Sequence, residues 1–299
     1  MTTTDEPTRQ PTLQPAAAPA ATAGTFRIGG DLAVHRLGYG TMQLPGPGVW
    51  GPSRDREGAL RVLRRAADLG VTLFDTADSY GPGVAEELLR DALHPYDGLV
   101  VATKVGFTRP GPGRWSTDGR PAHLRAAVEA SLRRLEVERI DLLQLHRIDP
   151  RVALADQVGT LADLRQEGKV RHLGLSEVGV AELDAAAAIA PIATVQNLYN
   201  LAERSAEPLL RVAEQRGIGF IPWFPLATGQ LSDPRGPLAR LASALGLAPS
   251  QVALAWLLQR SPVVLPIPGT SSVTHLQENL AAAAVDLDPA VLARLDHLA

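Results

Sequence analysis

Four side chains that can move protons follow one another along the first half of the chain. Asp75 and Tyr80 are five residues apart, Lys104 ends one apolar run, and His146 ends the next. An ammonium next to a phenol favours the phenolate, so we expect Lys104 to lower the pKa of Tyr80 from about 10. Such a phenol can protonate a developing alkoxide, while a neutral imidazole orients the carbonyl. The four residues therefore predict acid-catalysed chemistry at a carbonyl, with the electron pair supplied by a bound hydride donor.

Lysine is rare in this chain, which makes Lys104 informative. Lys104 and Lys169 are the only lysines among 29 basic residues. Lysine at a buried strand end, where the chain otherwise uses arginine, indicates that a compact ammonium is needed there. Lys169 lies just beyond the end of the predicted helix Leu154–Glu167, where a solvated cation is expected. One alternative stays open: Lys104 could be the nucleophile of a Schiff-base enzyme, which would bind no nicotinamide.

Extended and helical patterns alternate along the chain, and they must position these residues. Short β-branched or apolar runs predict buried strands: Arg36–Gln43, Thr72–Thr76, Leu99–Lys104, Ile140–His146, Val170–Glu177, Ala193–Asn200, Ile218–Leu226 and Val263–Gly269. Apolar residues at helical spacing predict helices between and after them: Arg56–Leu69, Val84–Leu93, His123–Leu135, Leu154–Glu167, Ala181–Ala188, Leu209–Arg216, Pro237–Leu245, Ser250–Gln259, Thr274–Ala284 and Pro289–Leu298. Ser250 and Asp288 are the expected N-caps of two of these helices.

A strand followed by a helix, repeated eight times, indicates an α/β fold with a parallel sheet. This number of units fits a (β/α)8 TIM barrel with extra helices in its C-terminal half. Residues Phe26–Arg36 predict an N-terminal β-hairpin that caps the bottom of the barrel. The rival is an open Rossmann sheet, but no predicted strand is followed by a G-x-G-x-x-G turn. In a barrel, Asp75, Lys104 and His146 lie at C-terminal strand ends and meet at one mouth.

Composition limits the remaining classes of function. The chain has 299 residues, 45% apolar content and a formal net charge of −3, which gives no electrostatic reason to expect nucleic acid or an anionic membrane as partner. Residues 1–24, rich in Thr, Pro and Ala, predict a disordered tail without the apolar core of a signal peptide, and residues 25–299 predict a single barrel domain. Without cysteine or a cluster of metal ligands, we expect neither a disulfide nor a metal. The expected state is a cytoplasmic monomer, with a homo-oligomer left open.

Three segments carry a resemblance to a known family. They are Phe74–Gly81 (FDTADSYG), Val101–Lys104 (VATK) and Asp141–His146 (DLLQLH). In order and spacing they resemble the catalytic segments of the aldo-keto reductase superfamily, and the resemblance extends over about residues 26–299. It implies a (β/α)8 barrel that uses NADPH, sometimes NADH, to reduce an aldehyde or ketone to an alcohol.

The resemblance also implies roles for the four proton-transfer residues. Tyr80 becomes the general acid, Asp75 and Lys104 tune it, and His146 positions the carbonyl. A slow-turnover regulatory subunit that keeps the nucleotide site, like the barrel partners of potassium channels, is an alternative. Loss of Tyr80 or Lys104 would favour that alternative, and both residues are present.

Further segments match the coenzyme contacts of the family. Glu177 stands where the family has asparagine, and Trp223 stands where an aromatic residue stacks on nicotinamide. Gly269 and His275 replace the Lys and Arg that hold the 2'-phosphate in many members, so NADPH is expected with NADH as the alternative. The implied coenzyme-binding residues are Gly40, Thr41, Ser176, Glu177, Gln196, Trp223, Pro225, Leu226, Gly269, Thr270, Ser271, Ser272, His275, Glu278 and Asn279.

Aromatic residues gather in the loops that follow the predicted strands. Aromatic walls suit a flat or apolar aldehyde, and the Gly- and Pro-rich loop Thr108–Pro121 predicts a mobile lid. Segments Leu37–Leu44 and Gln251–Ser261 resemble the bacterial pyridoxal reductase branch, which implies reduction of pyridoxal to pyridoxine. A biosynthetic ketone or sugar reductase is the alternative. The expected substrate-pocket residues are Met42, Trp50, Phe107, Trp115 and Phe224.

Overall fold

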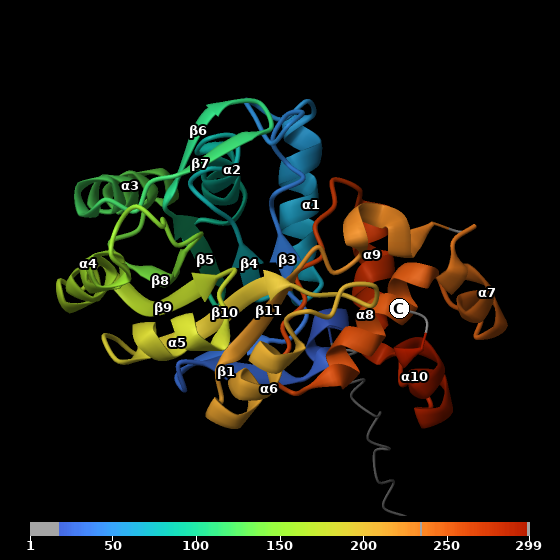
Figure 1. Cartoon of the computed structure of the whole chain (residues 1–299). Coiled ribbons are helices and arrows are strands. Elements are labelled where there is room, and N and C mark those ends of the chain that lie inside the picture. Colours follow the sequence, from blue (N-terminus) through green and yellow to red (C-terminus); the bar gives the residue numbers. More distant parts are fainter. Residues whose placement is uncertain (1–17, 234, 298–299) are drawn as a thin grey trace, which may run out of the picture.

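A computed structural model describes residues 18–233 and 235–297 of the chain. In this part of the chain, seven parallel strands form one sheet in the order β3–β4–β5–β8–β9–β10–β11. The sheet curls into a barrel with helices around it (Figure 1), which confirms the predicted fold class. The strands are β3 (Tyr39–Gly40), β4 (Leu73–Asp75), β5 (Val100–Val105), β8 (Ile140–Leu145), β9 (Val170–Ser176), β10 (Ile192–Leu198) and β11 (Gly219–Trp223).

The barrel closes between β11 and β3 through residues 263–269 rather than through a regular eighth strand. Phe220 N donates to Val263 O at 2.9 Å, and Gly38 N donates to Pro266 O at 2.9 Å. The predicted strand therefore occupies its expected place, but a single β-bridge joins it to β11. Pro266 and the proline two residues later explain this result, because proline has no N–H to donate to a ladder.

Each helix begins within two residues of its predicted start, because the apolar spacing marks the face that packs on the barrel. The helices are α1 (Arg56–Asp68), α2 (Val84–Leu93), α3 (Pro121–Leu135), α4 (Leu154–Gln166), α5 (Val180–Ala187), α6 (Glu207–Arg216), α7 (Pro237–Ala244), α8 (Pro249–Arg260), α9 (Val273–Ala281) and α10 (Pro289–Asp296), with 3-10 turns η1 (Pro19–Ala23), η2 (Ala227–Ser232) and η3 (Ala282–Ala284). The predicted N-cap Asp288 is confirmed, since its carboxylate accepts from Ala290 N at 2.8 Å.

The N-cap predicted for α8 is wrong. This helix begins at Pro249, with Ala248 as its N-cap, and the side chain of Gln251 accepts from Ala248 N at 2.9 Å. Proline suits the first helical position because it has no N–H that would be left unpaired there. Ser250 instead lies in the first turn, where its hydroxyl donates to Glu278.

The predicted N-terminal hairpin is present at one end of the barrel. β1 (Thr25–Ile28) and β2 (Leu32–His35) pair antiparallel. Ile28, Leu32 and Val34 pack in one cluster with inward-facing side chains of the barrel strands. In Figure 1, β1 and the β6–β7 hairpin lie at opposite sides of the molecule. The N-terminal hairpin thus fills the end of the barrel that is remote from the C-terminal strand ends.

The prediction of disorder as far as Gly24 is wrong for residues 18–24, whereas residues 1–17 lie outside the described residues. Ala20 N donates to Leu69 O at 3.1 Å, and Ala20 and Ala23 are buried in a cluster with side chains of α1. Alanine-rich composition suggested too little apolar surface to fold. Small side chains nevertheless pack well where two backbones come close, as they do here beside the C-terminal end of α1.

The predicted lid Thr108–Pro121 is largely a β-hairpin. β6 (Phe107–Gly111) and β7 (Arg114–Thr117) pair antiparallel, with Phe107 opposite Thr117. Glycine and proline in this segment suggested a structureless loop, but they occur at the tip and at a register shift of a paired element. The hairpin stands over the C-terminal ends of the strands.

No single helix in residues 18–233 and 235–297 is long and apolar enough to cross a membrane. α7 and α8 reach that length only when taken together, and they are bent by 90° relative to each other. The apolar side chains of α8 are buried within the fold.

Candidate active site

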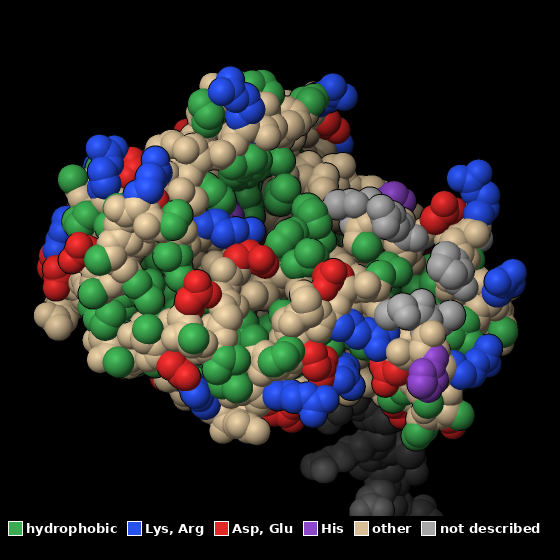
Figure 2. Space-filling model, viewed as in Figure 1, with side chains coloured by type: hydrophobic (Ala, Val, Ile, Leu, Met, Phe, Trp, Pro, Cys, Tyr) green, Lys and Arg blue, Asp and Glu red, His purple; other side chains and the backbone are tan. Residues whose placement is uncertain are grey.

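A cavity of about 770 Å³ lies at the C-terminal ends of the barrel strands. Figure 2 shows the hollow beneath the β6–β7 hairpin, with many hydrophobic side chains on its walls. The predicted residues that line it are Gly40, Met42, Asp75, Tyr80, Phe107, Trp115, His146, Ser176, Gln196, Trp223, Phe224, Pro225, Leu226, Gly269, Thr270, Ser271, His275, Glu278 and Asn279. Of the described residues predicted for the site, those that do not line it are Thr41, Trp50, Lys104, Glu177 and Ser272.

Asp75, Lys104 and Tyr80 meet at the floor of this cavity. Asp75 ends β4 and Lys104 lies near the end of β5, and these strands are paired neighbours. Lys104 Nζ donates to Asp75 Oδ1 at 2.5 Å, to Thr76 O at 2.9 Å and to Tyr80 Oη at 3.4 Å. Lys104 is fully buried, so its charge needs the partner that Asp75 supplies.

The acidity of Tyr80 differs from the prediction. Burial raises the pKa of Tyr80 above its ordinary value, and the nearby Lys104 ammonium lowers it only in part. The expected net lowering is wrong, because loss of hydration disfavours the phenolate more than the ammonium favours it. Burial is the largest single influence on Lys104 and lowers the pKa of its ammonium, but the interactions with Asp75 and Tyr80 together outweigh burial and raise this pKa. Tyr80 therefore holds its proton beside a permanently charged lysine.

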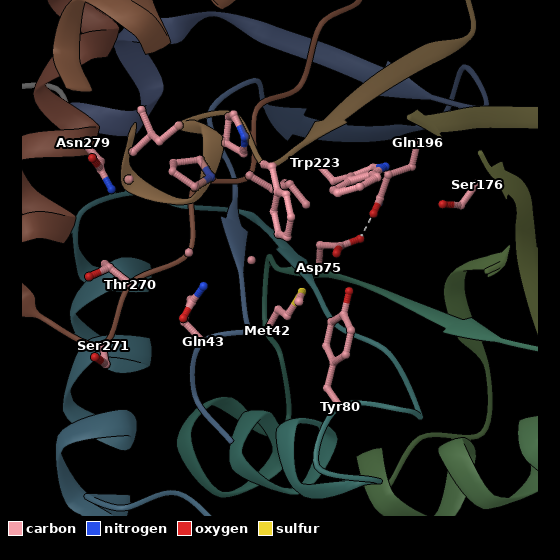
Figure 3. Close-up of a pocket in the computed structure, with 18 of the residues that line it drawn as sticks. Met42, Gln43, Asp75, Tyr80, Ser176, Gln196, Trp223, Thr270, Ser271 and Asn279 are labelled. Carbon is pink, nitrogen blue, oxygen red and sulfur yellow. Dashed lines mark hydrogen bonds between the residues drawn. The ribbon is translucent and has the colours of Figure 1, made fainter. Parts of the chain in front are cut away.

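The second oxygen of Asp75 is held by two amides. Gln144 Nε2 donates to Asp75 Oδ2 at 3.1 Å, and Gln196 Nε2 donates to it at 2.9 Å. In Figure 3, Gln196 and Asp75 point toward each other across the cavity wall, and the hydroxyl of Tyr80 points to the same place. With both oxygens bonded, the carboxylate is fixed beside the Lys104 ammonium.

His146 is a neutral ring at the same end of the cavity. Burial lowers the pKa of His146 well below its ordinary value, and the charges of Lys104 and Arg147 lower it further. Ser79 Oγ lies 3.3 Å from His146 Nδ1; with Ser79 as donor, the ring proton is on Nε2 and available to a ligand. The neutral state agrees with the role expected for a residue that orients a carbonyl.

Aromatic rings cover Tyr80 and His146. The ring of Phe107 lies 4.5 Å from that of His146, and Trp115 lies 6.3 Å from Tyr80, both measured between centroids. The guanidinium of Arg109 stacks on Trp115 at 3.6 Å from the ring centroid. This wall encloses the phenol and the imidazole in an apolar environment, where hydrogen bonds to a substrate are strengthened.

Arg109 also fastens the hairpin to the rim. Its Nη1 donates to Ser79 O at 2.5 Å and to Val49 O at 2.8 Å, and its Nη2 donates to Gly48 O at 2.9 Å. Trp50, predicted as a pocket residue, lies outside the cavity lining with its ring centroid 5.6 Å from this guanidinium. Trp50 therefore belongs to the outer support of the rim.

Trp223 and Glu177 form a pair that the sequence did not predict. Trp223 Nε1 donates to Glu177 Oε1 at 2.6 Å, and Leu198 N donates to the same oxygen at 2.6 Å. The carboxylate of Glu177 thus points at the indole edge instead of into the cavity. Glu177 has a left-handed backbone (φ 56°), which strains a residue with a β-carbon, and these two bonds hold it. The arrangement turns the indole face toward the cavity (Figure 3).

Hydroxyls and a helix N-terminus form the other end of the cavity. Thr270 and Ser271 line it just before α9, and Ser272 is the N-cap of this helix, accepting from His275 N. Asn279 lies near them in Figure 3, well apart from Tyr80. Free N–H groups and hydroxyls at a helix N-terminus suit a phosphate.

The floor between the two ends is bare backbone. A β-carbon on Gly269 would lie 2.6 Å from Gly40 O, and one on Gly40 would lie 2.7 Å from Ile267 O. Two loops can approach this closely only because both positions are glycine. The cavity is therefore continuous from Tyr80 and His146 to the hydroxyls of Thr270 and Ser271, an arrangement that suits an extended dinucleotide.

Sequence reasoning missed several residues of the site. Gln144 lies two residues before His146 on the same inward-facing side of β8, and this alternation was a usable signal. Arg147 follows His146 directly and also lines the cavity. Ser250 lines it from α8. No feature of the sequence marked Ser250 as a site residue, because serine is common on helices.

The sequence of the chain matches the model of a known protein family. The model of the Aldo/keto reductase family matches residues 36–299. The chain belongs to the aldo/keto reductase family. It is therefore an oxidoreductase of the type that carries out NADP-dependent reduction of small carbonyl compounds.

Related proteins and a related crystal structure align with nearly the whole chain. A pyridoxine 4-dehydrogenase of Escherichia coli is 44% identical over 93% of this chain and 99% of the relative. An uncharacterized oxidoreductase of Schizosaccharomyces pombe is 50% identical over 92% of this chain and 90% of the relative. The crystal structure of an aldo-keto reductase from Klebsiella pneumoniae in complex with NADPH has a TM-score of 0.78 at 32% identity, covering 92% of this chain and 94% of that one.

Proposed function

We propose that this chain catalyses the NADPH-dependent reduction of an aldehyde or ketone to an alcohol, with pyridoxal as the best single substrate. One observation carries the proposal: the protonated Tyr80 phenol lies 3.4 Å from a buried, charged Lys104, at a cavity wall shared with neutral His146. These are the groups needed to bind a carbonyl and protonate its oxygen.

The residues present fit a nicotinamide dinucleotide. Trp223 offers a flat face for the ring, Ser176 and Gln196 offer polar groups beside it, and Thr270 and Ser271 offer hydroxyls at a helix N-terminus for phosphate. When bound, the coenzyme supplies a hydride to the carbonyl carbon. NADPH is preferred in this proposal because relatives are crystallised with NADP or NADPH.

The proton is supplied by the chain itself. His146 and Tyr80 hold the carbonyl oxygen, and the Tyr80 proton moves to that oxygen as negative charge develops on it. Lys104 stabilises the phenolate that remains, because its ammonium is fixed in a site with little water to screen it. Asp75 keeps this ammonium charged and in place.

Pyridoxal is supported by two observations. The E. coli relative at 44% identity is named a pyridoxine 4-dehydrogenase, and Phe107 and Trp115 offer flat apolar walls that suit a pyridine ring.

We also propose that residues 25–299 act as one barrel domain in the cytoplasm, which the absence of cysteine supports.

The test follows NADPH and NADH absorbance with pyridoxal and with a panel of other aldehydes, ketones and sugars. Fast oxidation of NADPH with pyridoxal supports the proposal. Turnover only with other carbonyls keeps the chemistry and rejects the substrate. Tight coenzyme binding without any turnover rejects the enzyme in favour of a regulatory subunit, and trapping of a carbonyl on Lys104 by borohydride would identify a Schiff-base mechanism instead.

A further inference from the structure

Arg147 lines the cavity directly beside the carbonyl-orienting His146. Its Nη1 donates to His146 O at 2.6 Å and to Ser176 Oγ at 2.9 Å, which holds the guanidinium between the ends of β8 and β9. Within residues 18–233 and 235–297, no carboxylate forms an ion pair with Arg147, and Nε and Nη2 have no protein acceptor. Since arginine has five N–H donors, most of them remain available to a ligand.

The charged groups around Arg147 are hydrogen-bonded to partners other than its guanidinium. Asp75 neutralises Lys104 at 2.5 Å, and His146 is uncharged because burial lowers its pKa. The carboxylate of Glu177 is already bonded to the Trp223 indole and to a backbone N–H. Glu177 acts on the Arg147 guanidinium only through space, which favours its charged form, so among the described residues Arg147 has no directly bonded counter-ion.

The surroundings of Arg147 increase the effect of this charge. The guanidinium carbon lies 5.8 Å from the Phe107 ring centroid and 5.7 Å from that of Trp223. Arg147 is only partly exposed, and burial lowers the pKa of its guanidinium from the ordinary value. A partly desolvated cation without a directly bonded counter-ion is costly to keep, and an anionic ligand that bound to it would relieve part of this cost.

We propose that Arg147 determines specificity for carbonyl substrates that carry a negatively charged oxygen next to the carbonyl group. With the carbonyl oxygen held by Tyr80 and His146, an oxygen anion on the neighbouring ring atom is placed on the guanidinium, which can bind it through charge-assisted hydrogen bonds. The inference rests on the proposed reductase function and names its substrate class. Pyridoxal belongs to this class, since its phenolate oxygen is adjacent to its aldehyde.

The test compares two matched aldehydes, 2-carboxybenzaldehyde and its neutral methyl ester, as NADPH-dependent substrates. The ratio of their kcat/KM values is measured for the wild type, Arg147→Gln, Arg147→Lys and the control Arg211→Gln, whose guanidinium is exposed on α6 and bonded to Glu207. We expect the ratio to fall on the order of ten- to a hundredfold in Arg147→Gln, since a hydrogen bond to a charged group is lost. Arg147→Lys keeps part of the preference, and the control keeps all of it.

A binding measurement accompanies the kinetics. The dissociation constants of phthalate and of NADPH are measured by calorimetry with the full chain, phthalate in the presence of NADP+. An equal loss of kcat/KM on both aldehydes, or an unchanged phthalate affinity in Arg147→Gln, overturns the proposal. Loss of NADPH affinity with an unchanged ratio assigns Arg147 to the coenzyme and also overturns it. If the wild type reduces neither aldehyde, the panel of other carbonyls decides the reductase function, and phthalate binding decides the role of Arg147.

Discussion

The two ends of the cavity are built in different ways. At the reaction end, formed by Asp75, Tyr80, Lys104 and His146, each side chain is buried and has a charged or hydrogen-bonded partner within the protein. At the other end, formed by residues 269–279 and called the phosphate end after its proposed ligand, hydroxyl residues line the cavity beside a helix N-terminus and the chain offers few fixed charges. The first end is preorganised before any ligand arrives, whereas the second leaves donors free for the ligand.

This difference agrees with the functions that we propose for the two ends. Proton transfer needs a phenol and an ammonium at fixed separation, so their positions are determined by a costly buried ion pair. A phosphate brings its own charge and needs only N–H and O–H groups to receive it. We therefore expect changes at the reaction end to have large effects on turnover or folding, and changes at the phosphate end to have small ones.

The largest effect is expected for Tyr80→Phe, which removes the proton donor. Turnover should fall by about a hundred- to ten-thousandfold, the usual contribution of a general acid, while coenzyme affinity stays nearly the same. NADPH oxidation and NADPH fluorescence titration measure the two quantities. Tyr96→Phe is the matched control, because its hydroxyl only donates to Leu135 O outside the cavity. Turnover that survives in Tyr80→Phe would reject the assignment of the acid.

Lys104→Met should lower the free energy of unfolding by about 3–5 kcal/mol, because it leaves the Asp75 carboxylate buried without its cation. Urea unfolding measures this loss. The double variant with Asp75→Asn should recover most of the stability but not the activity, because the charge is removed from both partners. If Lys104→Met is as stable as the wild type, the buried ion pair does not hold the reaction end in place and the contrast between the two ends fails.

His146 should make stability depend on pH. Its folded pKa lies well below the ordinary value of 6.5, mainly because of burial. Below pH 6.5 the unfolded chain therefore binds a proton that the folded chain does not, and stability falls as pH falls, by up to about 1.4 kcal/mol per pH unit until the folded pKa is reached. Urea unfolding at pH 7 and 5.5 should show a smaller loss in His146→Asn. Equal losses would mean that other groups dominate this window.

The smallest effect is expected for Ser272→Ala at the phosphate end. The Ser272 hydroxyl accepts from His275 N at 3.4 Å, a long N-cap bond, so its removal should cost about 0.5 kcal/mol of stability. NADPH affinity should fall only a few-fold, since neighbouring hydroxyls remain. Isothermal titration and urea unfolding check both values, with Ser53→Ala on the surface as control. A collapse of coenzyme binding would show that one hydroxyl, and not the group, holds the phosphate.

Sequence periodicity predicted most of the barrel but not its seam. The barrel strands β4, β5, β8, β9, β10 and β11 repeat apolar runs that have no other place to be buried, so their order and their polar ends could be foreseen. Residues 263–269 looked equally strand-like, but Pro266 removes a ladder donor and leaves a single bridge. The residue types and their places at strand ends were sufficient to predict that Asp75, Tyr80 and Lys104 lie close together. The direction of the Tyr80 pKa was not foreseeable, because it depends on how completely the phenol is desolvated, which only the packed structure shows.

Two further errors have one physical origin. Ala20 and the hairpin around Arg109 both lie in segments whose composition suggested no stable structure. Ala20 is held by a backbone hydrogen bond and close packing, and Arg109 is held by carbonyl oxygens of distant loops. These regions are ordered by contacts between segments that lie far apart in the sequence. Local residue patterns do not predict such contacts.

The burial of Lys104 has a practical consequence for chemical labelling. Of the two lysine side chains, Lys104 is fully buried, whereas Lys169 is about one-third exposed. Lys169 directly precedes β9, at the end of the barrel opposite the cavity. Among lysines, an amine-reactive dye or an activated resin therefore meets a single accessible site on the far side of the molecule. A fluorophore or a solid support attached there leaves the cavity mouth open to solution.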